Sequence, residues 1–413
     1  MEAATAQVAL EGVRTDFPIL AREVEGRSIA YLDSAATAQK PAAVIEAISS
    51  YYRNSNANVH RSMHVLAAEA EALYEGGRLK VAELVGARAG EIVLVRNATE
   101  AINLVRFTWA RENVGPGDTV LITAMEHHSN IVPWQLLCAE QGARLEYLEV
   151  DGQGRLDLTD LDERLAGGVK LVALSHVSNV LGTINPVAEV AERAHAAGVR
   201  VLVDGAQAVP QFPVDVGATG ADFYAFTGHK MYGPTGIGVL WGKRELLDEM
   251  PPFLGGGSMI KAVEDDHSTW AAVPAKFEAG TPAIAESAGL GAAADFMTGL
   301  GMEAVRAHER ELTAYALERI SAVSGVTVYG PADAAERGAL VSFTVEGIHP
   351  HDLAELSNRE GVAIRAGHHC AQPLMRRLGV PATARASFAV YNTTDEVDRL
   401  VDAVESAKSI FGA

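Results

Sequence analysis

The chain has 413 residues, and its 34 Lys and Arg against 53 Asp and Glu give a formal net charge of −19. A surface this acidic serves solubility and repels nucleic acid and anionic membranes, so neither is expected as a partner. Hydrophobic residues make up 48% and charged residues 21% of the chain, as in soluble globular proteins. Its length exceeds one ordinary core, so two domains are expected.

The cysteine content and the N-terminus bear on the compartment. Cys138 and Cys370 are the only 2 cysteines, too few for a disulfide-built fold of this length. The N-terminal residues lack the basic start and apolar run of a signal peptide, and no uninterrupted apolar stretch is long enough to cross a bilayer. These features predict a cytoplasmic protein without a membrane partner.

Short apolar segments alternate with amphipathic ones between about residues 90 and 241. Strands are expected over residues 91–95, 119–124, 170–176, 199–203, 222–226 and 237–241, and helices over 98–112 and 186–197. This alternation predicts an α/β fold with a mostly parallel sheet between helices. Such sheets bind ligands beyond the carboxyl ends of their strands, so the polar residues at the strand exits are the candidate site.

The pattern changes after about residue 290. Helical segments come first, followed by expected strands over residues 340–345, 362–365 and 384–390 and by a helix over 394–410. Thr393 and Glu396 have the spacing of a capping box at the start of that last helix. We therefore expect a large domain over residues 22–292 and a smaller α+β domain formed by residues 1–21 and 293–413.

Two strand exits carry the strongest chemical signal. Asp204 ends an apolar strand, where an unpaired carboxylate is costly and a protonated pyridine nitrogen is a suitable partner. Lys230 follows another apolar strand, and a buried lysine can form a Schiff base with an aldehyde. Alone, Asp204 could begin a turn and Lys230 could be a surface lysine. Their combination with Gln207, Thr227 and His229 favours a site.

Other kinds of site lack support in the sequence. No GxxxxGK[ST] motif occurs, no GxGxxG follows a strand, and HExxH and paired CxxC motifs are absent. His368 and His369 beside Cys370 could suggest metal ligands, but adjacent residues of an extended chain point to opposite sides. No metal, nucleotide or dinucleotide is therefore expected.

Several motifs resemble a known family. Residues 204–241 resemble the cofactor region of fold-type I enzymes that use pyridoxal 5′-phosphate (PLP), in the class V aminotransferase group. Further segments resemble the SUF-type (group II), SufS-like cysteine desulfurases: YLDSAAT (31–37), NVHR (58–61), EHHSNIVPWQ (126–135), FLGGGSMI (253–260), FEAGTP (277–282), RAGHHCAQP (365–373) and RASFAVYN (385–392). The likeness extends from about residue 14 to near the end of the chain.

The resemblance implies roles for the matching residues. Lys230 would hold PLP, Asp204 would pair with its pyridine nitrogen, and Gln207 would bind its phenolic oxygen. His127 would stack on the ring and take part in catalysis. The phosphate ligands would be Thr99, at a helix start that favours anions, Thr227, His229 and, from the second subunit of a homodimer, Thr281. The substrate ligands would be Asn179, Arg385, Arg365 and His60, with Arg offering a planar fork to a carboxylate.

Cys370 is the residue that distinguishes desulfurases from most of their relatives. Nearby Arg365, His368 and His369 favour the nucleophilic thiolate. A free cysteine can instead be an inert core residue, and Cys138, within a helical segment, fits that description better. The resemblance implies conversion of L-cysteine to L-alanine with Lys230 as general base and a persulfide on Cys370, which a SufE- or SufU-type acceptor collects for iron–sulfur cluster assembly.

Three other functions remain open at this point. A selenocysteine lyase shares the scaffold and cofactor and could act on L-selenocysteine without Cys370. A plain aminotransferase would consume a keto-acid and would not need that thiol. A non-catalytic scaffold would have no use for the combination of Lys230, Asp204, His127 and Cys370.

Overall fold

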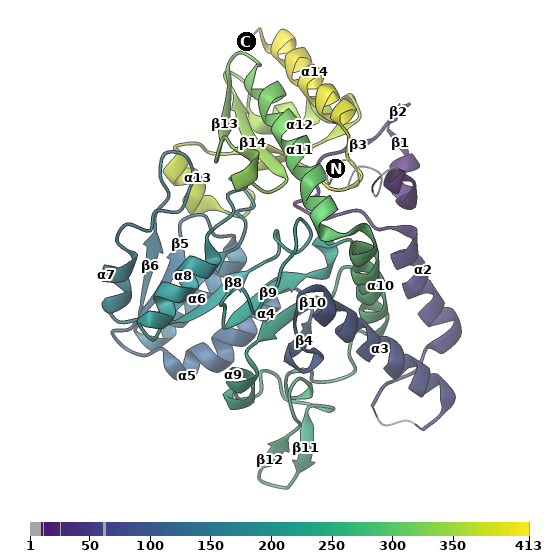
Figure 1. Ribbon diagram of the computed structural model, residues 1–413, viewed down its shortest axis with the longest axis vertical. Helices are drawn as coiled ribbons and strands as arrows, with labels where there is room; N and C mark the ends of the chain where they lie inside the picture. The colour runs from purple at the N-terminus through teal and green to yellow at the C-terminus, as the bar shows by residue number, and fades with distance from the viewer. Residues whose placement is uncertain (1–9, 11, 25, 61–62, 413) are drawn as a thin grey trace.

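The computed structural model describes residues 10, 12–24, 26–60 and 63–412. At its centre lies a seven-stranded sheet in the order β4-β10-β9-β8-β7-β5-β6 (Figure 1). The strands are β4 (Ile92–Val95), β5 (Thr119–Thr123), β6 (Arg144–Leu148), β7 (Val169–Ser175), β8 (Arg200–Asp204), β9 (Phe223–Thr227) and β10 (Gly238–Gly242). Strands β5 to β9 run parallel to one another, and β10 is antiparallel to both of its neighbours. The predicted α/β class with a mostly parallel sheet is confirmed.

Helices cover both faces of this sheet, which explains why most of its strands are predominantly apolar, the edge strand β6 being the exception. In β8, Val201 and Val203 belong to one hydrophobic core and Leu202 to another. The first core includes residues of α3 (Val65–Leu84), α8 (Val187–Ala196) and α10 (Ile284–Leu300), and the second includes residues of α4 (Ala98–Val105) and α6 (Val132–Gln141). Alternate side chains of each strand thus bury against opposite helical layers.

A smaller antiparallel sheet follows in the C-terminal part of the chain, at the top of Figure 1. Its strands, in spatial order, are β13 (Val326–Tyr329), β14 (Leu340–Val345), β17 (Thr383–Ser387) and β16 (Arg365–Gly367). A third core joins this sheet to α11 (Met302–Ser321), α12 (Pro350–Arg359) and α14 (Thr394–Phe411). The capping box of Thr393 and Glu396 at the start of α14 is formed as predicted.

The single strand predicted over residues 362–365 is wrong. Val362–Ala363 (β15) pairs in parallel with Ala30–Tyr31 (β3), whereas β16 begins at Arg365 and pairs with β17. The chain changes partner at Ile364, and apolar alternation does not encode which strand is the partner. The predicted boundary between residues 292 and 293 falls inside α10, and the division into two domains stays a prediction.

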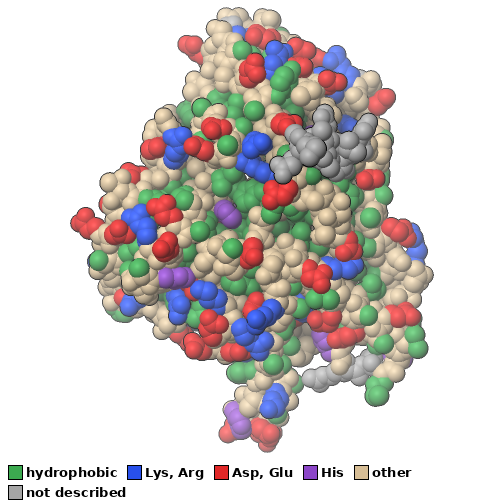
Figure 2. All heavy atoms as spheres, in the orientation of Figure 1, with side chains coloured by type: hydrophobic (Ala, Val, Ile, Leu, Met, Phe, Trp, Pro, Cys, Tyr) green, Lys and Arg blue, Asp and Glu red, His purple; other side chains and the backbone are tan. Residues whose placement is uncertain are grey.

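The remaining elements are short or peripheral. They are β1 (Glu23–Val24), β2 (Arg27–Ser28), α2 (Ala42–Ser50), α5 (Arg111–Asn113), α7 (Leu161–Ala166), α9 (Arg244–Glu249), β11 (Ile260–Val263), β12 (Ser268–Trp270) and α13 (Gln372–Leu378). The β11–β12 hairpin projects beyond the body of the molecule (Figure 1). Figure 2 shows acidic and basic side chains intermingled over one face. In the described part of the chain, every helix is too short or too polar to span a bilayer.

Candidate active site

A cavity of about 290 Å³ lies where the carboxyl ends of the parallel strands face the small sheet. All the predicted site residues except Thr281 and His60 line it, namely Thr99, His127, Asn179, Asp204, Gln207, Thr227, His229, Lys230, Arg365, Cys370 and Arg385. Asp204 and Thr227 are the last residues of β8 and β9, and Arg385 lies within β17. The two sheets together therefore place residues that are far apart in the sequence around one space.

The two exceptions lie elsewhere on the chain. Nδ1 of His60 is 3.1 Å from Oε1 of Glu71. Thr281 lines a separate cavity of about 510 Å³ together with Leu254. Arg61, the last residue of the NVHR motif, lies outside the described residues. The roles of His60 and Thr281 stay predictions, the second of them for a partner subunit.

Asp204 is buried and Lys230 is half-buried in the lining of the cavity, and each affects the other. Oδ1 of Asp204 accepts a hydrogen bond of 3.0 Å from the backbone N–H of Ala206. Burial raises the pKa of Asp204, and the charge of Lys230 opposes that rise. Burial lowers the pKa of Lys230 to about 8, against the opposing effect of Asp204. A cation beside Asp204 and an amine that loses its proton near neutral pH are both favoured here.

Gly205 makes the turn after Asp204 possible. A Cβ atom at this position would lie 2.0 Å from Cε1 of Tyr224, so only glycine fits. The phenol oxygen of Tyr224 is 2.8 Å from Nδ1 of His176. The Asp-Gly pair that could have signalled an ordinary turn therefore serves to bring the chain close to a buried aromatic ring.

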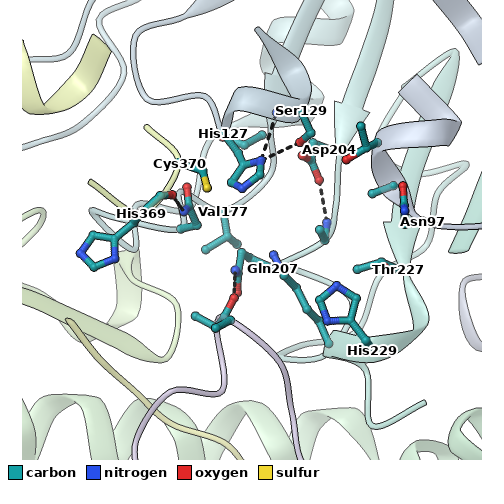
Figure 3. Close-up of a pocket in the computed structure, with 18 of the residues that line it drawn as sticks. Asn97, His127, Ser129, Val177, Asp204, Gln207, Thr227, His229, His369 and Cys370 are labelled. Carbon is teal, nitrogen blue, oxygen red and sulfur yellow. Dashed lines mark hydrogen bonds between the residues drawn. The ribbon is translucent and has the colours of Figure 1, made fainter. Parts of the chain in front are cut away.

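His127 lies on the cavity wall near Cys370, while Thr227 and His229 lie on the other side (Figure 3). The Nδ1 atom of His127 accepts a 3.1 Å hydrogen bond from the backbone N–H of Ser129 and lies 2.8 Å from the hydroxyl oxygen of Ser129. Burial, followed by the charge of Lys230, lowers the pKa of His127 to about 3. The ring is therefore neutral and suited to stacking on a cationic aromatic ring.

The end of the cavity near α4 suits a phosphate group. Asn97 caps α4 by accepting a hydrogen bond of 2.9 Å from the N–H of Glu100, and Thr99 follows in the first turn. Oγ1 of Thr227 is buried without a hydrogen-bond partner among the described residues. Free donors at a helix start together with an unsatisfied hydroxyl are features that bind an anion. With Asp204 and Lys230 at the other end, the residues present fit PLP.

Two guanidinium groups occupy the side of the cavity formed by the small sheet. Arg365 and Arg385 lie directly opposite each other in the β16–β17 pair. Arg385 donates 2.8 Å from Nη1 to the carbonyl of Asn179 and 3.2 Å from Nη2 to Oδ1 of Asp33. The Nδ2 of Asn179 donates in turn to the carbonyl of His369 at 2.7 Å. This arrangement fixes a positive fork that can bind a carboxylate.

The two cysteines differ in their surroundings. The positive charge predicted beside Cys370 comes from Arg365, which lines the cavity, and not from His369, because burial lowers the pKa of His369 to about 2. Cys370 is half-buried, lines the cavity and has a left-handed backbone with φ of 57°. Cys138 is buried in α6, and burial raises the pKa of its thiol to about 11. Cys138 is therefore an unreactive thiol at neutral pH, and Cys370 is the one that a substrate in the cavity can meet.

Some lining residues received no role from the sequence. They are Ala35, Ala36, Asn97, Ala98, Ser129, Ser175, Val177 and Ala206. Asn97 follows β4 and is among the strand-exit residues that the sequence indicates, whereas Ser175 is the last residue of β7 and lies one residue before the predicted exit group. Ser129 lies inside a motif used for the resemblance, but no pattern indicated its contact with His127. Across the described ranges, no cluster of three or more His, Cys, Asp or Glu side chains could hold a metal ion.

Comparisons with known proteins agree with this geometry. The model of the aminotransferase class-V family matches residues 30–400. A probable cysteine desulfurase of Streptomyces coelicolor is 52% identical over 97% of this chain and 98% of its own length. A cysteine desulfurase of Haloferax volcanii is 48% identical, over 98% of both chains.

Two solved structures are similar over nearly the whole fold. The cysteine desulfurase CsdA of Escherichia coli has a TM-score of 0.90 and 41% identity, covering 97% of this chain and 99% of that one. The apo cysteine desulfurase of Thermococcus onnurineus has a TM-score of 0.92 and 39% identity, covering 96% and 97% respectively.

Proposed function

Because the chain belongs to the cysteine desulfurases of the aminotransferase class-V family, we propose that it converts L-cysteine to L-alanine and collects the sulfur on Cys370. It is a PLP-dependent enzyme whose sulfur would serve iron–sulfur cluster assembly. The observation that carries the proposal is one cavity lined by Lys230, Arg385 and Cys370. Lys230 supplies an amine, Arg385 a guanidinium group that can bind the substrate carboxylate, and Cys370 a thiol, all around the same space.

The cofactor would be held by residues at both ends of the cavity. PLP, when bound, supplies an electron-withdrawing ring that stabilises negative charge at the substrate α-carbon. Lys230 would hold it covalently, and Asp204 would keep its ring nitrogen protonated. The remaining ligands would be Thr99, Thr227, His229 and Gln207, together with the stacked ring of His127.

The chain's own residues would carry the reaction as follows. Arg385 and Asn179 bind the substrate carboxylate and thereby fix its orientation. Once the substrate amine has released Lys230 from the cofactor, the amine of Lys230 takes the proton from the α-carbon, for which a pKa of about 8 is well placed. The sulfur of Cys370 forms a bond to the substrate sulfur while the substrate C–S bond breaks. Cys370 thereby becomes a persulfide and loses its thiol proton. One proton is taken up in turn by the substrate β-carbon, which becomes the methyl group of alanine.

A mass measurement tests this proposal. PLP-loaded enzyme would receive one equivalent of L-cysteine without reductant, followed by alkylation and peptide mass spectrometry. We expect one added sulfur atom on the Cys370 peptide, in the wild type and in a Cys138→Ala variant alike. Alanine formation with the extra sulfur on Cys138, or on neither cysteine, would contradict the proposal.

The half-buried position of Cys370 supports transfer of the persulfide sulfur to a protein of the SufE or SufU type, within a SUF system in the cytoplasm. Adding such an acceptor protein should accelerate alanine formation, and the amount of sulfur bound to the acceptor should rise in step with the alanine formed. L-Selenocysteine is a second candidate substrate, since selenium leaves carbon more readily. A Cys370→Ala variant that still releases selenium but no sulfur would show that only the reaction with L-cysteine needs the Cys370 thiol.

A homodimer would explain why Thr281 lies outside the cavity of its own chain. Leu254, which lines the same surface cavity as Thr281, is exposed, as are Met63 and Val65 near the start of α3. Exposed apolar side chains of this size are common at subunit interfaces. Sedimentation equilibrium should give twice the chain mass, and a monomer would contradict this part of the proposal.

A further inference from the structure

The turn that carries Cys370 is in a conformation that its own residues disfavour. His369 and Cys370 have φ angles of 50° and 57°, in the left-handed region that residues with a Cβ atom rarely adopt. Two such residues in succession persist only where surrounding contacts hold them. The contacts that hold this turn therefore determine where the Cys370 thiol lies.

Two imidazole rings accept hydrogen bonds from the backbone of this turn. The N–H of Cys370 donates to Nδ1 of His368 at 3.1 Å, and the N–H of Gln372 donates to Nε2 of His128 at 3.1 Å. The two rings lie near each other, with centroids 5.6 Å apart. A backbone N–H can only donate, so both named ring nitrogens are unprotonated.

His128 contacts the turn at a second point. Its own backbone N–H donates to the carbonyl oxygen of Cys370 at 2.7 Å. The side chain and the backbone of this one residue therefore bind Gln372 and Cys370 on either side of Ala371. Burial and the neighbouring His368 lower the pKa of His128, which keeps the ring a neutral acceptor at neutral pH. Because His127 precedes it, His128 also ties the turn to the segment that lines the cavity.

We propose that His128 and His368 are positioning residues for Cys370, which hold its turn in the left-handed conformation that presents the sulfur to the cavity. The proposal rests on Cys370 being the sulfur acceptor. The step that depends on these two rings is sulfur transfer to Cys370. Substrate binding by Arg385 and α-proton removal by Lys230 do not depend on them.

Paired variants separate the acceptor from the bulk of each side chain. His128→Gln and His368→Asn keep a carbonyl oxygen that can accept near the original nitrogen, whereas His128→Leu and His368→Leu do not. In PLP-loaded enzyme, persulfide formation on Cys370 would be measured by rapid quench in a single turnover. The α-proton exchange of L-alanine in D₂O would be followed by NMR, since it needs Lys230 but no sulfur transfer.

We expect the Leu variants to slow persulfide formation by about threefold to tenfold, the factor that one lost hydrogen bond corresponds to. α-Proton exchange should stay at the wild-type rate, and the Gln and Asn variants should recover most of the persulfide rate. Iodoacetamide should alkylate Cys370 faster in the Leu variants, because the turn is released, with Cys138 as the internal reference.

Three results would overturn the proposal: an unchanged persulfide rate in both Leu variants, equal slowing in the Leu and the amide variants, or a parallel loss of α-proton exchange. If the wild type forms no persulfide on Cys370, the proposed function fails. The alkylation rates would still decide whether the two rings hold the turn.

Discussion

Replacing Arg385 by Lys should raise the KM for L-cysteine much more than it lowers kcat. Arg385 is 2% exposed, and its two terminal nitrogens donate to Asn179 and Asp33. Its Nε has no partner among the described residues. Lysine keeps the charge but loses the planar fork, so one charge-assisted hydrogen bond to the substrate, worth about 1.5–3 kcal/mol, should be lost. At about 1.4 kcal/mol per factor of ten, KM should rise about 10- to 150-fold.

Initial rates of alanine formation over a range of L-cysteine concentrations measure this effect. Arg376→Lys, on the exposed surface of α13, is the matched control and should keep the wild-type KM. Thermal unfolding of both PLP-loaded variants checks that the fold is intact. An unchanged KM in a folded Arg385→Lys enzyme would refute the assignment of Arg385 to the substrate carboxylate, since binding of the ground state is what KM would report here.

Two further predictions concern stability. Glu278→Gln should lower the free energy of unfolding by about 1.5–3 kcal/mol in urea titrations, because it removes a charge-assisted partner of the buried Arg78. The pair is 2.6 Å long, with side chains 6% and 2% exposed, and Arg78 keeps its hydrogen bonds to Glu75. A wild-type midpoint would contradict the prediction. For Asp222, burial raises the pKa, but hydrogen bonds from Lys243 and His195 outweigh burial and leave that pKa below its ordinary value. Its stabilising contribution is thus present above the unfolded-state pKa and lost as the pH falls through the folded-state pKa, below about pH 4. Wild type should lose stability more steeply there than Asp222→Asn, and parallel curves would refute this.

The sequence predicted six of the seven strands of the large sheet because those strands are largely buried on both faces. The edge strand β6 was missed, since its residues RLEYL include two charged side chains and only Leu148 is fully buried. An apolar run such as β8 leaves no ambiguity about burial, and the polar residues after it mark the ligand edge. The antiparallel direction of β10 was not predictable, since apolar content carries no direction. The break between β15 and β16 at Ile364 was missed for a similar reason. Strand β15 pairs with β3 near the start of the chain and β16 pairs with β17, and the apolar pattern of a segment does not say which strand it pairs with.

The site was predictable where a residue's chemistry is unusual for its position. Asp204 and Lys230 at the ends of apolar segments meet that condition, and Cys370 does so through the neighbouring Arg365. The roles of His128 and Ser129 depend instead on backbone hydrogen bonds that form only in the folded turn. Thr281 and His60 could not be placed from one chain, because neither lines the cavity within it.

Turnover of L-cysteine by the Cys370→Ala variant tests the central claim most directly. Alanine and sulfide would both be quantified with PLP-loaded enzyme and a thiol reductant, for wild type, Cys370→Ala and the control Cys138→Ala. We predict equal amounts of alanine and sulfide from the wild type and the control, and neither product from Cys370→Ala. Wild-type amounts of both products from Cys370→Ala would contradict the claim that Cys370 accepts the sulfur.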